Sequence, residues 1–130
     1  MSVTDLLQTA RTDRKSIVAL DVVHLGRRVL TPVRIDPDDL DKRDDVRRFH
    51  SKDEKRIGEL LDLIENAAPV ANNLTPELRW KLTFRDAAEE PVLEAWHNNY
   101  EPYGQIGTTR VKFAHDGILK FLHAHFDPND

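Results

Sequence analysis

The sequence predicts an α+β fold: a single antiparallel sheet of about five strands, arranged as a hairpin plus a meander, with helices packed on one face. Three patterns carry this prediction. Residues 78–85 alternate apolar and polar side chains, the period of two that a half-buried strand requires. Residues 52–67 repeat apolar side chains at i, i+3, i+4 and i+7, the period of an amphipathic helix. The apolar runs after residue 78 are separated by short polar turns, and strands joined in this way pair antiparallel.

The first part of the chain predicts a short helix followed by a hairpin. Ser2 or Thr4 is expected to cap the helix, because a hydroxyl oxygen can accept from a free amide of the first turn. Residues 16–25 are β-branched and apolar and predict a strand. Residues 28–35 are expected to return as its hairpin partner. Pro32 places that second strand at a sheet edge, since proline has no N–H to donate to a ladder.

The middle of the chain predicts a polar connection and then a long helix. Residues 36–45 contain six Asp and form the connection. Ser51 and Glu54 have the spacing of a capping box, in which each side chain accepts from the backbone of the other residue. This pattern predicts the start of a helix over residues 52–67, and Pro69 ends it.

The last part of the chain predicts three strands and a closing helix. In residues 78–85 the apolar side chains are expected in the core, and the Arg and Lys side chains form a basic outer face. Residues 91–97 and 105–113 predict the next two strands of the meander. Asp116 is expected to cap a final helix over residues 117–126.

Composition and length predict one globular domain covering residues 1–130. Hydrophobic residues make up 39% of the 130 residues and charged residues 32%, which supports one core. The absence of Cys excludes disulfide frameworks and thiol catalysis. The chain shows no signal-peptide pattern, and no apolar run approaches the roughly 20 residues that span a bilayer. We therefore expect a cytoplasmic protein that does not bind membranes.

Charge is distributed unevenly along the chain. Residues 36–45 and 86–109 together carry a charge of −9, although the whole chain has a net charge of −4. The second of these segments has five acids, no Lys or Arg, and the aromatic residues Trp96, Tyr100 and Tyr103. Such a surface suits a basic protein partner, because charge speeds the encounter and rings supply buried contact area. It argues against nucleic acid, whose phosphates require a contiguous basic surface.

We therefore predict that the acids and aromatics of the second segment bind the partner. These residues are Asp86, Glu89, Glu90, Glu94, Trp96, Tyr100, Glu101 and Tyr103. Two alternatives stay open. In one, residues 36–45 form the binding face instead of residues 86–109. In the other, the Asp-rich connection of residues 36–45 is simply a solvated loop. Trp96 is in phase with Glu94, so it is either an exposed anchor or a buried core residue.

No pattern in the sequence predicts catalysis, a metal or a cofactor, so we do not expect an enzyme. The six histidines are His24, His50, His97, His115, His123 and His125. The last two lie two positions apart on the predicted closing helix, about 200° around its axis, and cannot both face one ion. His97 with Glu94 or Glu101 would provide an acid and a base, but no nucleophile stands nearby in a defined motif.

The chain resembles small bacterial immunity proteins encoded beside polymorphic or contact-dependent toxins. The resemblance rests on the hairpin–helix arrangement through residues 51–67, the meander that starts at residues 78–86, and the closing helix from residue 116. It implies a non-enzymatic inhibitor that covers the active site of a basic toxin, often a nuclease, with acidic and aromatic groups. No residue role carries over, because such families share no invariant functional motif.

Two further hypotheses come from the predicted architecture alone. A small-ligand or cystatin-like module would hold an apolar pocket between the sheet and the helix over residues 52–67. A structural or homo-oligomeric protein, for example a homodimer, would pair through an exposed sheet edge.

Overall fold

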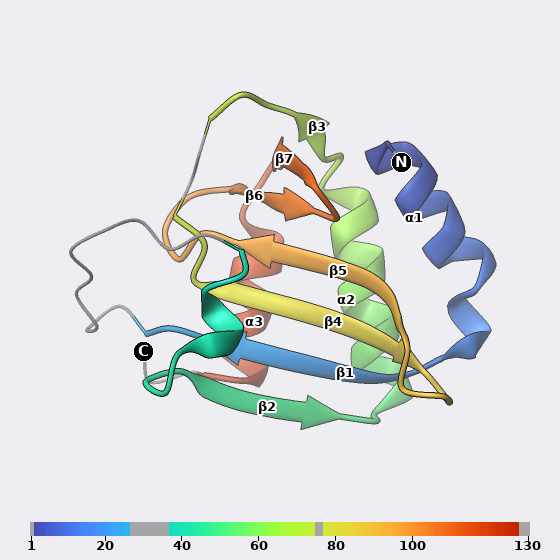
Figure 1. The fold of residues 1–130 in the computed structure, drawn as a ribbon. Coiled ribbons are helices and arrows are strands. Elements are labelled where there is room, and N and C mark those ends of the chain that lie inside the picture. Colours follow the sequence, from blue (N-terminus) through green and yellow to red (C-terminus); the bar gives the residue numbers. More distant parts are fainter. Residues whose placement is uncertain (1, 27–36, 75–76, 128–130) are drawn as a thin grey trace.

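The protein was analysed as a computed structural model that describes residues 2–26, 37–74 and 77–127. Within these residues it has three α-helices and one antiparallel sheet with the strand order β2-β1-β4-β5-β6-β7-β3 (Figure 1). The strands are β1 (Ile17–His24), β2 (Arg47–Ser51), β3 (Val70–Ala71), β4 (Trp80–Asp86), β5 (Pro91–His97), β6 (Tyr103–Ile106) and β7 (Thr109–Lys112). The helices are α1 (Val3–Thr12), α2 (Glu54–Asn66) and α3 (Gly117–His125), and short 3-10 turns form η1 (Arg14–Ser16) and η2 (Leu40–Lys42). The predicted α+β class is confirmed, but the sheet has seven strands rather than about five.

The first helix and strand form where the sequence predicts them. The Ser2 hydroxyl accepts from the Asp5 amide at 3.1 Å, and the Asp5 carboxylate accepts from the Ser2 amide at 3.4 Å. This reciprocal pair satisfies two amides that the first turn of α1 leaves free. The predicted hairpin strand over residues 28–35 lies outside the described residues. Within them, β1 pairs antiparallel with β2 on one side and with β4 on the other.

Strand β2 is not predicted by the sequence pattern, and it shifts the start of the next helix. Only Phe49 in this strand is a large apolar residue, as is common in short, charged edge strands. Because the strand extends to Ser51, the predicted capping box is wrong: Ser51 is buried, and its hydroxyl accepts from the Asp53 amide at 3.2 Å. Asp53 caps α2 instead, accepting from the Arg56 amide at 3.2 Å. The helix itself is confirmed.

Two strands replace the single strand predicted over residues 105–113. Gly107 has a φ of +59°, which a glycine adopts without strain, and the chain reverses there between β6 and β7. The two-residue strand β3 then adds to the outer side of β7. At the closing helix, Asp116 occupies the cap position but its side chain makes no capping hydrogen bond. His115 Nδ1 accepts from the Gly117 amide instead, at 3.1 Å.

The core lies between the sheet and the helices. Helices α2 and α3 lie behind the sheet in Figure 1, and α1 packs beside α2 against β5. Trp80, Leu82 and Phe84 of β4 are buried against them, as predicted. Leu78, which was predicted on the same face, is buried in a separate apolar cluster. The most buried core residues include Leu20, Val22, Leu60, Ile64, Trp80, Leu82, Phe84 and Leu122. Among the described residues, the opposite face of the sheet carries no α-helix, only the short 3-10 turn η2, and we call it the open face. No helix among the described residues is long and apolar enough to cross a membrane.

One residue after α2 is held in a conformation that glycine prefers. Ala68 is exposed and has a φ of 46°, in the left-handed region that costs a non-glycine residue about 1 kcal/mol. We predict that Ala68→Gly raises the free energy of unfolding by about 0.5–1 kcal/mol, measured by urea denaturation. Ala67→Gly is the control, because Ala67 is fully buried with a φ of −73° and should lose stability. A loss of stability in Ala68→Gly would contradict the prediction.

Candidate functional site

The structure distributes the predicted partner-binding residues along β5 rather than gathering them in one cluster. Asp86, Glu89 and Glu90 lie at the turn before β5, and Tyr100, Glu101 and Tyr103 lie at the loop after it or where β6 begins. Glu94 and Trp96 lie on the strand between these two groups. Because β5 has seven residues, the two groups are roughly 20 Å apart. We call them the acidic turn (residues 86–90) and the tyrosine loop (residues 98–103).

The acidic turn exposes the carboxylates of Glu89 and Glu90 to solvent. Asp86 has a structural role, since its carboxylate accepts from the Ala88 amide at 2.9 Å and the Glu90 amide at 3.0 Å. Glu89 has a φ of 65° and its carbonyl accepts from Arg85. Glu89 and Glu90 are exposed, and neither carboxylate forms an ion pair within the described residues. Both are therefore free to meet a cation from another molecule.

The tyrosine loop presents an aromatic ring on a fixed backbone. Tyr100 is 62% exposed, and Glu101 beside it is exposed as well. The Asn98 side-chain oxygen accepts from the Tyr100 and Glu101 amides at 2.8 and 3.0 Å. The Asn98 amide group donates to the Glu77 carbonyl at 2.8 Å, which ties the loop to the segment before β4. Tyr103 is half-buried, with the Lys112 ammonium 5.8 Å from its ring centre.

Trp96 lies on the open face, yet it is buried. Its exposed fraction is 7%, and it belongs to one apolar cluster with Leu40 of η2, which is fully buried. The two side chains belong to a second apolar cluster, in front of the sheet, together with Val23, Leu25 and Leu78. The sequence did not decide whether Trp96 is an exposed anchor or a buried residue. The structure shows that it is buried. Its indole N–H has no hydrogen-bond partner among the described residues.

Lys81 brings the two acidic segments of the sequence together. Its ammonium lies 3.1 Å from the Glu94 carboxylate, contacts the Asp41 carboxylate, and lies 5.5 Å from the Trp96 ring centre. Burial acts to lower the pKa of Lys81, but hydrogen bonds to the two carboxylates outweigh it and raise the pKa. Arg48 also donates to the Asp41 carbonyl, at 2.8 Å. The predicted basic outer face of residues 78–85 is therefore partly covered and neutralised by the chain's own Asp-rich connection.

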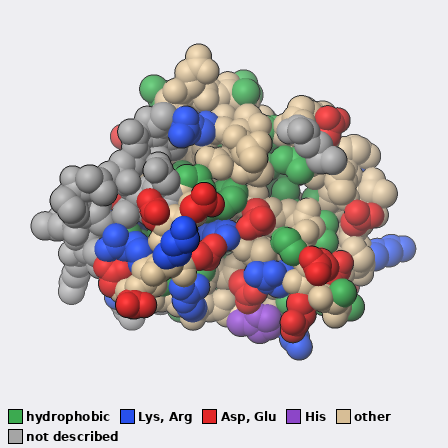
Figure 2. Space-filling model, viewed as in Figure 1, with side chains coloured by type: hydrophobic (Ala, Val, Ile, Leu, Met, Phe, Trp, Pro, Cys, Tyr) green, Lys and Arg blue, Asp and Glu red, His purple; other side chains and the backbone are tan. Residues whose placement is uncertain are grey.

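A second charged group on the open face is also paired. The two oxygens of the Asp21 carboxylate bind His50 Nδ1 at 2.6 Å and Arg85 Nε at 2.7 Å. Burial raises the pKa of Asp21, but these two hydrogen bonds outweigh it, so the pKa lies below its ordinary value. Acidic and basic side chains are intermingled over this face (Figure 2). The open face is thus mixed in charge, and the exposed acids Glu89, Glu90 and Glu101 lie at the two ends of β5.

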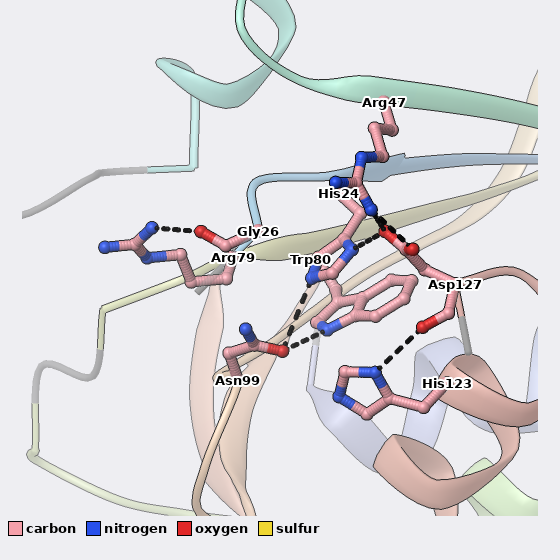
Figure 3. A network of polar contacts seen from close by, with 8 residues as sticks. All are labelled: His24, Gly26, Arg47, Arg79, Trp80, Asn99, His123 and Asp127. Carbon is pink, nitrogen blue, oxygen red and sulfur yellow. Dashed lines mark hydrogen bonds and ion pairs between the residues drawn. The ribbon is translucent and has the colours of Figure 1, made fainter. Parts of the chain in front are cut away.

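A buried polar network joins the end of α3 to the sheet (Figure 3). Arg47 Nη1 donates to both oxygens of Asp127 at 2.5 and 2.6 Å, and His24 Nδ1 lies 2.8 Å from the same carboxylate. The Asn99 side-chain oxygen accepts from Trp80 Nε1 at 2.8 Å, and the Trp80 ring stacks on His24 at 3.5 Å. Sequence reasoning missed this network because His24 and Asp127 are 103 positions apart. The network joins the residue after α3, two strands of the sheet and the loop after β5, so it holds these elements together.

Removing the centre of this network should destabilise the fold. Asp127 is 5% exposed, and its loss leaves a buried histidine and an arginine without their carboxylate. We predict that Asp127→Ala lowers the free energy of unfolding by about 3 kcal/mol. Arg47→Ala is the matched comparison and should cost under about 1 kcal/mol, because that side chain is 55% exposed. Equal losses for the two variants in urea denaturation would contradict this interpretation.

His97 does not form an acid–base pair with Glu94. It lies on the core face, opposite Trp80, whereas Glu94 lies on the open face opposite Thr83. Its ring is 1% exposed and stacks on Phe113, and Nδ1 lies 2.5 Å from the Asn98 carbonyl. Nε2 has no hydrogen-bond partner in the described part of the chain. Burial lowers the pKa of His97 from 6.5 to about 4, so it is neutral at pH 7.

This depressed pKa predicts a pH dependence of stability. Between pH 6.5 and about 4 the unfolded chain binds a proton at His97 that the folded chain does not, so stability falls as the pH is lowered. The loss from this residue amounts to about 3 kcal/mol. We predict that His97→Phe, which keeps an aromatic ring against Phe113, flattens the stability profile between pH 7 and about 4. The exposed His125→Ala variant is the control, and a steep profile in His97→Phe would contradict the prediction.

The predicted ligand pocket between the sheet and α2 is filled by core side chains in the described part of the chain. A hollow of about 20 Å³ remains between α1, α2 and Leu93, about the space of one water. A larger open groove of about 1090 Å³ runs outside the core between η1, the start of β1 and α2. Arg14 lies across this groove, donating to the Gly58 carbonyl and to Asp62 at 2.7 Å each. Gly58 leaves room for that guanidinium.

The comparisons with known proteins do not extend this description. No family model, curated protein or solved structure matches the chain. The resemblance to immunity proteins therefore stays a prediction. Across the described residues, no three His, Asp or Glu side chains are grouped so that they could hold a metal ion.

Proposed function

We propose that this chain is a non-enzymatic, protein-binding inhibitor of the immunity type, which acts in the cytoplasm on a basic toxin domain such as a nuclease. The observation that supports this best is the exposed Tyr100 beside Glu101, on a loop that Asn98 holds in place. The partner-binding residues in this proposal are Tyr100 and Glu101 together with Glu89 and Glu90.

A tyrosine on a fixed loop is well suited to anchor a partner. Its ring has few rotatable bonds, so it loses little entropy on binding while contributing a large contact area. Asn98 makes three hydrogen bonds that order the loop in advance, which lowers the entropic cost of association. Aromatic residues of this kind are common among those that dominate binding energy.

The distance between the two ends of β5 fits one partner. A standard interface buries about 800 Å² on each protein, a patch roughly 30 Å across. One partner can therefore contact the tyrosine loop and the acidic turn at once, since these lie roughly 20 Å apart. The carboxylates of Glu89, Glu90 and Glu101 make no ion pair within the described residues, so they would attract Lys and Arg side chains of a partner.

The partner can be identified by placing a photo-reactive phenylalanine analogue at position 100 and crosslinking in cells of the source organism. We predict that the captured protein is basic. With that protein purified, Tyr100→Ala should weaken binding at least tenfold, mainly through faster dissociation. Glu89→Lys with Glu90→Lys should mainly slow association, on the order of tenfold at low salt, because these charges steer the encounter.

The matched control is Glu59→Lys, an exposed acid on α2, away from the open face; it is compared with Glu89→Lys alone, since each single substitution changes the net charge equally. It should leave both rates close to those of the unchanged chain, which separates a local effect from a change in net charge. Surface plasmon resonance measures the two rates directly. Binding that is insensitive to Tyr100→Ala, or a captured partner that is acidic, would overturn the proposal.

A further inference from the structure

An open groove lies at the end of the sheet where β1 begins. It runs between η1, the first residues of β1 and α2, and has a volume of about 1090 Å³. We call it the η1 groove. Its volume is close to the upper end of the range for ligand pockets, about 1,000 Å³. None of the residues that line it belongs to the acidic turn or the tyrosine loop.

The sheet has a free edge inside this groove. Strand β2 pairs with β1 only from Leu20 onward, because Ser51, opposite Leu20, is the last residue of β2. Residues 17–19 therefore have β4 as their only neighbouring strand among the described residues. A strand edge without a neighbour presents backbone N–H and C=O groups that an extended segment can pair with. A segment added here would lie in line with β2.

Val18 supplies an apolar contact at this free edge. The register between β1 and β4 shifts between Ile17 and Ala19, so Val18 is the extra residue of a bulge. Its side chain is 43% exposed, although it is β-branched and apolar. On the α2 side of the groove, Ile57 and Leu61 are buried. An aliphatic side chain on a bound segment would remove Val18 from water, which favours binding.

Two lysines beside the free edge have no ionic partner. Lys15 lies in η1 and Lys52 directly follows β2, and both side chains are exposed. Neither ammonium forms an ion pair with any described residue. Five bases and three acids line the groove, in a chain whose net charge is −4. The groove therefore has an excess of positive charge, which suits a segment that carries carboxylates.

The three acids that line the groove do not neutralise these lysines. Asp62 lies 2.7 Å from Arg14, so its charge is balanced at close range. Glu59 lies 3.9 Å from the Lys55 ammonium. Glu54 lies in the first turn of α2, where the helix dipole favours a negative charge. Carboxylates of a bound segment would thus be the partners that Lys15 and Lys52 lack.

We propose that the η1 groove binds an extended acidic segment of another protein, which adds to the free edge of β1 in line with β2. An aliphatic side chain of the segment contacts Val18, and its carboxylates reach Lys15 and Lys52. The proposal does not rest on the proposed inhibitor function, which uses the tyrosine loop and the acidic turn. The acidic turn follows β4, on the opposite side of β1 from the free edge. The groove thus serves a second partner, whose contact is acidic rather than basic.

Selection from a displayed library of random peptides identifies the segment that the groove prefers. The unchanged chain is the target, and a triple variant with Val18→Asp, Lys15→Glu and Lys52→Glu removes peptides that bind elsewhere. We expect the enriched peptides to combine Asp or Glu with Val, Ile or Leu, because these groups match the lysines and Val18. The three substituted side chains are exposed, so the triple variant should unfold at close to the same urea concentration as the unchanged chain.

A synthetic copy of the most enriched peptide is the probe for calorimetric titration. Lys15→Glu with Lys52→Glu should weaken its binding at least about tenfold at low salt, because each substitution replaces an attraction with a repulsion. The matched control is Lys112→Glu, an exposed base on β7 at the other side of the sheet, compared with Lys52→Glu alone. Both single substitutions change the net charge equally, and only Lys52→Glu should weaken binding.

NMR titration with the same peptide locates its binding site. The backbone amide resonances of Val18 and Ala19 should shift, and those of β7 should not. Shifts confined to other residues, or enriched peptides without acidic residues, would overturn the proposal. So would a selection that enriches no peptide over the triple variant. A homodimer that Val18→Asp dissociates would also overturn it, because a second copy of the chain would then occupy the edge.

Discussion

The antiparallel register between β1 and β4 is the constraint on which the rest of the structure depends. It places Val22 opposite Leu82, and Val23 opposite Lys81. A slip of one residue would turn the core side chains of β4 outward and its charged side chains inward. The same register therefore decides which face of the sheet the helices cover. It also places the charged contacts of Lys81 and Arg85 on the other face.

The open face shows how the acidic segments are used. Asp41 from one segment and Glu94 from the other meet at Lys81, and Asp21 joins His50 to Arg85. Carboxylates paired in this way cannot also attract a partner strongly, because their charge is already balanced at close range. Glu89 and Glu101 form no ion pair within the described residues and lie at the two ends of β5, where we propose that a partner binds.

The polar network around Asp127 and the apolar cluster around Leu40 lie on opposite faces of the sheet. In the network, His24 and Arg47 contact the Asp127 carboxylate, which ties the residue after the end of α3 to β1 and β2. On the open face, Leu40 packs in the second apolar cluster, and Asp41 contacts Lys81 and Arg48. Each group therefore holds a segment that lies outside the sheet against one of its faces.

The sequence by itself determined the elements whose signals are local. The apolar period predicted the helix over residues 52–67, and alternation predicted the strand over residues 78–85. The apolar run after a short polar turn predicted the strand over residues 91–97. These patterns depend only on near neighbours. Tertiary structure decided β2, the burial of Trp96 under Leu40, and the pairing of Lys81 with Asp41 across 40 positions. It also separated the predicted binding residues into two groups. Those outcomes depend on which strands become neighbours, and the free energy of that choice comes from packing and charge pairing between distant residues, which no local pattern records.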